Sequence, residues 1–167
     1  MRVDPPTVLR MSQPIFELHG RLDLPDLSFI RYATIRDLDQ LVPACAAMHR
    51  EEVGIDPLER DALGYRERVR ELIDRRRSFV RIEDGRIAAK CELSAVTPEA
   101  AQIMGVWTAP DQRRRGFGRA LMREVCGHLC RQGKAVTLFV NDFNKVAVRL
   151  YESLGFRQIG LNRAMIW

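Results

Sequence analysis

Three consecutive arginines, Arg113, Arg114 and Arg115, precede a short turn at residues 116–118, and this stretch could bind an anion. Residues 101–108 before it are mostly apolar and predict a strand, and residues 119–126 after it predict a helix. The first backbone N–H groups of a helix have no partner within the helix, and the helix dipole places partial positive charge there. Glycine allows a ligand to approach the backbone closely, and guanidinium groups match phosphate oxygens. We therefore expect a pyrophosphate-binding cradle between the strand and the helix.

The glycine spacing does not match two other phosphate-binding patterns. A dinucleotide-binding turn would carry a further glycine three residues after Gly118, where Leu121 stands. A Walker-type loop would contain Gly-Lys-Ser or Gly-Lys-Thr, which the sequence lacks. A surface turn with solvated arginines is the alternative interpretation of the stretch alone.

A second motif lies at residues 144–156 and reads Asn-Lys-Val-Ala-Val-Arg-Leu-Tyr-Glu-Ser-Leu-Gly-Phe. In this order and at this separation, the two motifs resemble those of the GCN5-related N-acetyltransferase (GNAT) superfamily. That signature is Arg/Gln-x-x-Gly-x-Gly/Ala after one strand, then Asn-x-x-Ala-x-x-Leu-Tyr-x-x-Leu-Gly-Phe after the next. The resemblance runs from about Phe29 to the C-terminus.

Residues 49–54 and 138–144 also resemble the C-terminal acetyltransferase domain of a two-part actinobacterial GNAT family. Those proteins carry an additional N-terminal domain, most of which has no counterpart here. Whether the chain is a short relative or a fragment of such a protein stays open.

Composition indicates one globular domain with an acidic partner. The chain has 167 residues, of which 46% are hydrophobic and 29% charged, as in ordinary soluble domains. The net charge of +5 suits a phosphate-rich cofactor as well as nucleic acid. Because aromatic residues make up only 7% and do not alternate with basic ones, we do not expect nucleic acid as a partner.

No apolar run is long enough to span a membrane and no signal peptide is recognisable, so we expect a cytoplasmic protein with no membrane partner. Cys45, Cys91, Cys126 and Cys130 form no Cys-x-x-Cys pair, and the three histidines are isolated. We expect no metal site, and we interpret the cysteines as buried structural thiols.

The order of predicted elements indicates an α/β fold of the α+β kind. A hairpin with an Asp84-Gly85 turn leads into strand–helix–strand–helix units. This order implies a mixed, mostly antiparallel central sheet with helices on both faces, as in GNAT folds. The resemblance further implies that the fourth and fifth strands, residues 100–108 and 136–140, splay apart to admit the cofactor.

The expected GNAT acetyltransferase domain spans residues 28–167, after an N-terminal tail or remnant segment at residues 1–27. Pro5, Pro6 and Pro14 suggest the tail, although residues 15–18 alternate and could form a short strand. Two helices should precede the first hairpin. Their predicted apolar stripes are Leu38, Leu41, Val42, Cys45 and Met48 in the first, and Leu63, Val69, Leu72 and Ile73 in the second.

The family resemblance implies acetyl-CoA as the co-substrate. Backbone amides from Arg114 to Gly118 would hold its pyrophosphate, the backbone of Val106 and Thr108 would pair with the pantetheine arm, and Asn144 would hydrogen-bond that arm or cap its own helix. The predicted cofactor-binding residues are Val106, Trp107, Thr108, Arg113, Arg114, Arg115, Gly116, Phe117, Gly118, Arg119 and Asn144.

Two residues are predicted to be catalytic. The resemblance implies that Tyr151, two helical turns after Asn144, donates a hydrogen bond or a proton to the departing thiol; a packed core tyrosine is the alternative. Some relatives place a glutamate base about where Gln102 stands, and glutamine cannot take a proton near neutral pH. Glu92 is therefore the predicted base, with Glu51 or Glu52 as further candidates and surface charge as the alternative for each.

These inferences predict an N-acetyltransferase that moves an acetyl group from acetyl-CoA to an amine of a small molecule or peptide, by direct attack in a ternary complex. The alternative is a non-catalytic acyl-CoA-binding or regulatory module of GNAT fold. An α-amino group, with a pKa near 8, needs less help from a base than a lysine at about 10.4, and the missing glutamate favours a weakly basic amine. The acceptor's identity and the oligomeric state, with a homodimer as one option, stay open.

Overall fold

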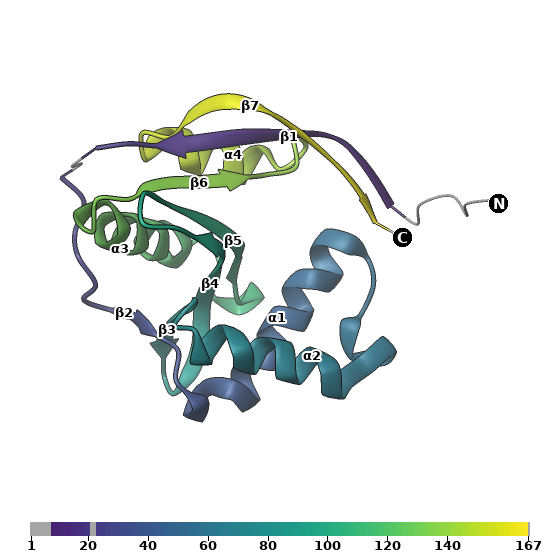
Figure 1. The fold of residues 1–167 in the computed structure, drawn as a ribbon. Helices are drawn as coiled ribbons and strands as arrows, with labels where there is room; N and C mark the ends of the chain where they lie inside the picture. Colours follow the sequence, from purple (N-terminus) through teal and green to yellow (C-terminus); the bar gives the residue numbers. More distant parts are fainter. Residues whose placement is uncertain (1–7, 21–22, 167) are drawn as a thin grey trace.

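The computed structural model describes residues 8–20 and 23–166, which form one mixed sheet with helices on both faces (Figure 1). The sheet of the described residues has the order β2-β3-β4-β5-β6-β1-β7 and is antiparallel except between β5 and β6. This arrangement confirms the predicted fold class. The strands are β1 Val8–Leu18, β2 Ile30–Tyr32, β3 Ser78–Glu83, β4 Arg86–Val96, β5 Ala100–Thr108, β6 Ala135–Phe139 and β7 Arg157–Ile166. The helices are α1 Leu38–Val53, α2 Pro57–Asp74, α3 Phe117–Arg131 and α4 Lys145–Ser153, with short 3₁₀ turns at Ile35–Asp37 and Pro110–Gln112.

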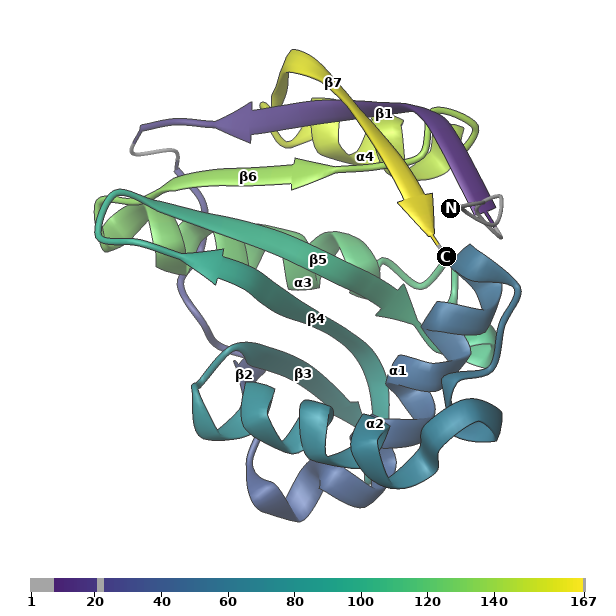
Figure 2. The same cartoon turned by 45° about the vertical axis from the view of Figure 1, so that its right-hand side comes forward.

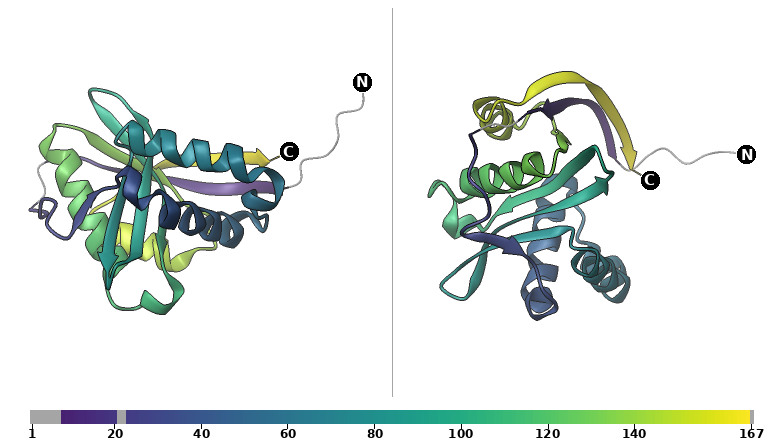
Figure 3. Two further views of the ribbon diagram at one scale, coloured as in Figure 1. Left: turned by 90° about the horizontal axis from the view of Figure 1, so that it is seen from below. Right: turned by 60° about the vertical axis from the view of Figure 1, so that its left-hand side comes forward.

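Each face of the sheet has its own hydrophobic core, because side chains along a strand point alternately to the two faces. Phe79 on β3 belongs to the core that contains α3 and α4, whereas its neighbour Val80 belongs to the core under α1 and α2. Successive side chains of a strand point to opposite faces, so one strand serves both cores. Figure 3 shows α1 and α2 on one side of β3–β5 and α3 on the other.

The apolar stripe predicted for α1 is confirmed for its first four members, which are all buried. The stripe predicted for α2 is wrong at Leu63, which is 80% exposed, although Val69 and Ile73 are buried. The backbone leaves helical geometry at Asp61 (φ −158°, ψ 84°), and Leu63 lies in the first turn after this kink, ahead of the buried Val69 and Ile73.

The N-terminal tail or remnant segment expected at residues 1–27 includes an inner strand, because β1 lies between β6 and β7 and pairs with both. Residues 1–7 lie outside the described part of the chain. Pro14 is accommodated within β1, and its carbonyl accepts a hydrogen bond from the amide of Val140 at 3.2 Å. Phe16 and Leu18 are buried in the α3–α4 core. The segment therefore supplies an inner strand beside β6, one of the two splayed strands.

The predicted splay lies between β5 and β6. The two strands pair only at Ala100–Ala135, Ala101–Val136 and Gln102–Thr137, and they diverge beyond these pairs (Figure 2). A β-bulge in β5 adds to the bend, because Trp107 lies opposite Lys90 whereas Met104 lies opposite Glu92. The gap opens towards the start of α3 and the start of α4.

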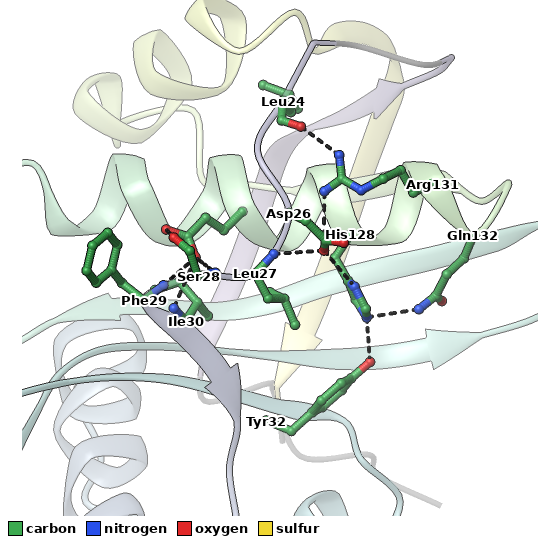
Figure 4. Close-up of polar contacts among 11 residues, drawn as sticks. Leu24, Asp26, Leu27, Ser28, Phe29, Ile30, Tyr32, His128, Arg131 and Gln132 are labelled. Atoms are coloured by element: carbon green, nitrogen blue, oxygen red, sulfur yellow. Dashed lines mark hydrogen bonds and ion pairs between the residues drawn. The ribbon is translucent and has the colours of Figure 1, made fainter.

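Residues 24–30, which lead into β2, run along α3 (Figure 4). The buried carboxylate of Glu124 accepts hydrogen bonds from the amides of Ser28 (2.7 Å), Phe29 (3.0 Å) and Ile30 (3.0 Å). One turn further along α3, His128 lies 3.1 Å from an Asp26 carboxylate oxygen and 3.0 Å from the Tyr32 hydroxyl. These contacts hold β2 and the residues before it against α3, the helix that begins at the predicted cradle.

Candidate active site

A cavity of about 620 Å³ occupies the splay between β5 and β6. Its walls include the end of α1, the first turn of α3 and the inner face of α4. Ten of the eleven predicted cofactor-binding residues line it, and so does Tyr151. The ten are Val106, Trp107, Thr108, Arg113, Arg114, Gly116, Phe117, Gly118, Arg119 and Asn144.

The predicted cradle is a turn in which positive and negative φ angles alternate along the backbone. Arg114 (φ 60°) and Gly116 (φ 82°) both adopt left-handed conformations, and α3 begins directly afterwards at Phe117. Gly116 occupies the N-cap position and provides no side-chain cap for the first amides of α3. Gly116 therefore leaves these amides without a side-chain acceptor, an arrangement that suits an anion site.

Gly118 brings the first turn of α3 close to the end of β5. A Cβ added at this position would lie 3.1 Å from the Thr108 hydroxyl oxygen, tighter than an ordinary contact. The absence of a side chain here leaves room at the wall of the cavity. The residues present therefore fit a phosphate group held by backbone donors.

The arginines of the cradle have different partners. One guanidinium nitrogen of Arg113 donates to both carboxylate oxygens of Glu51, at 2.8 and 2.7 Å, and links the cradle to the end of α1. The Arg115 guanidinium lies 4.8 Å from the Phe117 ring centroid and donates to the side chain of Gln112. Arg115 does not line the cavity, so the structure does not bring this predicted residue to the site.

Asn144 is the N-cap of α4, where its side-chain oxygen accepts a hydrogen bond from the Ala147 amide at 3.2 Å. It also lines the cavity. The side-chain NH₂ group of a capping asparagine keeps its donors, so a helix cap and a contact with a bound molecule are compatible here.

Tyr151 is buried on the inner face of α4 and reaches the cavity. Its ring packs 5.8 Å from the ring of Phe156 and 6.5 Å from the ring of Phe16, measured between centroids. Burial raises the pKa of its hydroxyl well above the usual value, and the Glu52 carboxylate raises this pKa further. Tyr151 is therefore a neutral phenol near pH 7 and can act only as a hydrogen-bond or proton donor to a developing anion.

The three candidate bases lie in three different environments. Glu52 lines the cavity and interacts electrostatically with Tyr151. Glu51 also lines it, but its carboxylate binds Arg113 and accepts a hydrogen bond from the Trp107 indole at 3.2 Å. Glu92, the base predicted from the sequence, does not line the cavity.

Glu92 is instead buried beside Lys90, with 2.9 Å between its Oε2 and the ammonium nitrogen. Gln102 is also outside the site, because its side-chain oxygen accepts a hydrogen bond from the Ser94 hydroxyl at 2.8 Å. Because Glu92 is paired with Lys90 and does not line the cavity, it is not placed to contact a molecule bound there.

Two polar residues at the cavity were missed in the sequence, Gln13 and Asn141. Gln13 is 1% exposed, donates to the Asn141 side chain at 2.9 Å, and accepts from Asn162 at 3.0 Å. Both Gln13 and Asn141 line the cavity. Gln13 lies in the segment expected to be a tail. A glutamine beside an alternating apolar segment indicates a site residue only when that segment is known to form an inner strand.

The four thiols are buried, and burial raises the pKa of each, that of Cys45 to about 12. Among the described residues, no group of three or more His, Cys, Asp or Glu side chains could hold a metal ion. Within the same part of the chain, no helix is long and apolar enough to cross a membrane.

A family model described as the acetyltransferase (GNAT) family matches residues 40–156, which include both motifs and most of the cavity wall. The chain belongs to the GNAT family. Membership accounts for the splayed strands as part of the GNAT fold. It confirms the resemblance found in the sequence.

Curated relatives match the chain over part of their length. The [ribosomal protein bS18]-alanine N-acetyltransferase of Escherichia coli is 34% identical over 87 residues, which are 52% of this chain and 58% of that protein. The mycothiol acetyltransferase of Kocuria rhizophila is 38% identical over 66 residues, which are 39% of this chain and 22% of that protein.

A solved GNAT acetyltransferase from Colwellia psychrerythraea superimposes with a TM-score of 0.69, over 94% of this chain and 56% of that one. At 16% sequence identity, this likeness supports the fold alone.

Proposed function

We propose that this protein transfers an acetyl group from acetyl-CoA to an amine by direct attack of the amine in a ternary complex. The observation that carries the proposal is the convergence of the cradle, the open edge of β5 and Tyr151 on one cavity. Membership in the GNAT family supports acyl transfer, and the geometry suggests which residues perform each part of it.

The cofactor would extend from the cradle to Tyr151. Amides of the turn and the first turn of α3 would hold the pyrophosphate, and charge-assisted hydrogen bonds of this kind contribute about 1.5–3 kcal/mol each. Beyond Gln102, β5 has an edge that is not paired with β6 and that runs along the cavity. The backbone of Val106 and Thr108 on this edge would pair with the pantetheine arm as a strand would, with Asn144 on the opposite side.

The chemistry requires one bond to form and one to break. The amine nitrogen attacks the thioester carbonyl carbon, the carbon–sulfur bond breaks, and the sulfur leaves as a thiolate that needs a proton. Ordinary pKa values of about 10 for tyrosine and 8.5 for a thiol make full transfer from a phenol uphill by roughly 2 kcal/mol. Burial raises the pKa of Tyr151 further, so its hydroxyl would hydrogen-bond the sulfur as the bond breaks and give up its proton only at the end.

The amine must lose one proton to become nucleophilic and a second proton after it has attacked the carbonyl carbon. We assign this role to Glu52 in place of Glu92, because Glu52 lines the cavity and interacts with Tyr151. Glu51 is engaged with Arg113 and would keep the cradle against α1. Gln13 and Asn141 would contribute polar contacts to the acceptor side.

The acceptor class follows from the relatives and from the available base. One relative is named for acetylating an alanine of a ribosomal protein, and another is a mycothiol acetyltransferase. A carboxylate base such as Glu52 deprotonates an amine with a pKa near 8 more readily than a lysine side chain near 10.4. We therefore propose an α-amine, or a weakly basic amine of a small molecule, as the acceptor.

A panel of amines tests the proposal. Release of free CoA from acetyl-CoA is followed with peptides that carry a free α-amine, with the same peptides blocked at the N-terminus, and with small amines. Turnover with free but not blocked α-amines is the expected result. Turnover only with lysine side chains would contradict the acceptor class, and turnover with no amine would favour the non-catalytic acyl-CoA-binding alternative.

A further inference from the structure

A buried ion pair lies directly behind the wall of the cavity, on β4. Lys90 is 0% exposed and Glu92 is 2% exposed, and their charged groups are 2.9 Å apart. The Cys45 thiol donates to the other carboxylate oxygen at 3.4 Å. Neither charged residue lines the cavity, so the proposed chemistry leaves the pair without a role.

The pair packs against Gly105, the one glycine within β5. A Cβ built on Gly105 would lie 2.1 Å from Glu92 Oε2 and 3.2 Å from Lys90 Nζ. The carboxylate therefore occupies the space that any other side chain at this position would take. Gly105 also has a φ of 60°, a conformation that favours glycine.

Gly105 belongs to the bulge that bends β5 along the cavity. Between the pairs Lys90–Trp107 and Glu92–Met104, both Gly105 and Val106 lie opposite the single residue Cys91. Gly105 and Val106 line the cavity, where β5 no longer pairs with β6. The shape of the bulge thus determines how the backbone groups of this wall face a bound molecule.

A gain in folding stability does not by itself explain why a charged pair is buried at this position. Two charges removed from water rarely gain enough from each other to repay their desolvation, and well-packed apolar residues of similar size often serve a fold equally well. What a hydrogen-bonded ion pair adds is a fixed geometry. The neighbouring groups leave the pair electrically balanced, because burial raises the pKa values of Cys45 and of Tyr65 to about 12 each and both stay neutral.

We propose that Lys90 and Glu92 are positioning residues that support the bulge at Gly105 and so hold the backbone of this wall in register with the reacting thioester. This inference rests on the proposed acetyl transfer. Glu92, which the sequence suggested as a base, would then act on the reaction through the backbone of β5 and would not contact a substrate.

The test replaces both charges together in the full chain, as Lys90→Met with Glu92→Leu, because a single replacement would leave one charge unpaired in the core. The control is Arg31→Met with Asp37→Leu, which removes an ion pair of 2.7 Å beside β2, outside the cavity. Circular dichroism and thermal unfolding report the fold, calorimetry reports acetyl-CoA affinity, and steady-state kinetics with the best amine report kcat and KM.

A positioning role predicts that kcat falls at least about tenfold in the Lys90/Glu92 variant while acetyl-CoA affinity stays within about twofold. The control should keep the wild-type kcat. A folded Lys90/Glu92 variant with kcat within about twofold of wild type would overturn the inference but leave the proposed function intact. Wild-type protein that transfers no acetyl group to any amine would overturn the proposed function, and the inference with it.

A second pair of variants covers the case in which the double replacement does not fold. Gly105→Ala should lower kcat because the new methyl group displaces the carboxylate, and Glu92→Asp should relieve this contact by withdrawing the carboxylate one methylene. The strain of alanine at positive φ is the same in both backgrounds, so a double-mutant cycle isolates the contact. Partial recovery of kcat in the combined variant supports the inference, and independent, multiplicative losses contradict it.

Discussion

Tyr151→Phe removes one oxygen atom from the centre of the proposed site and leaves the rest of the side chain in place. The ring keeps its neighbours Phe16 and Phe156, so we expect the free energy of unfolding to change by no more than about 1 kcal/mol. Positioned proton donors contribute about 10²–10⁴-fold to rate. At 1.36 kcal/mol for each tenfold change, the expected loss of transition-state stabilisation is about 2.7–5.4 kcal/mol.

The assay measures CoA release under steady-state conditions, with acetyl-CoA affinity determined separately by calorimetry. The prediction is a fall in kcat with unchanged cofactor affinity, because the hydroxyl acts on the departing sulfur and not on the pyrophosphate. The pKa of Tyr151 is raised, and a phenol ionises only above its pKa, so wild-type kcat should show no loss from this group up to pH 9. A kcat for Tyr151→Phe within about threefold of wild type would refute the role of Tyr151 as a donor.

Two further predictions concern the surroundings of the site. Glu124→Ala removes the acceptor of three backbone amides, and we expect it to lower the free energy of unfolding by about 3–5 kcal/mol, or Tm by roughly 8–15 °C, in thermal unfolding; a loss below about 1 kcal/mol would contradict the bound segment of Figure 4. The hydrogen bond from Arg31, followed by those from Thr34, lowers the pKa of Asp37 to about 2. Because the folded-state pKa lies below the ordinary value, Asp37 should stabilise the protein above about pH 4 by at most about 2 kcal/mol and lose this contribution as the pH falls towards 2. Denaturant titrations at pH 2.5 and pH 6 should therefore differ less for Asp37→Asn than for wild type, and equal differences would contradict the assignment.

The local motifs of the site could be predicted from the sequence because the residues of each motif lie within one short segment. The cradle needs arginines, glycines and a helix start in immediate succession, and in the structure Gly116 is the N-cap of α3 and Gly118 lies close to Thr108. Asn144 and Tyr151 lie on one short helix, so their common exposure to the cavity follows from helical spacing.

The parts that could not be predicted depend on contacts between distant segments. β1 could not be predicted because Pro14 argues against an inner strand, and its partners β6 and β7 lie more than 100 residues further along the chain. Gln13 was missed for the same reason. Glu92 was chosen because it is a carboxylate on the strand before β5, but the sequence does not show that Lys90 neutralises it or that Gly105 separates it from the cavity.

The measurement that tests the central claim most directly is calorimetric titration of acetyl-CoA and of CoA into the full chain and into two variants of Gly118. Gly118→Ala and Gly118→Asp share the same new contact with Thr108, and they differ in the negative charge that aspartate brings to the cradle. We predict low-micromolar binding by the wild type, a modest loss in Gly118→Ala and no binding by Gly118→Asp. Folded wild-type protein that binds neither ligand, or a Gly118→Asp variant that binds as well as Gly118→Ala, would contradict the assignment of the cradle to the pyrophosphate.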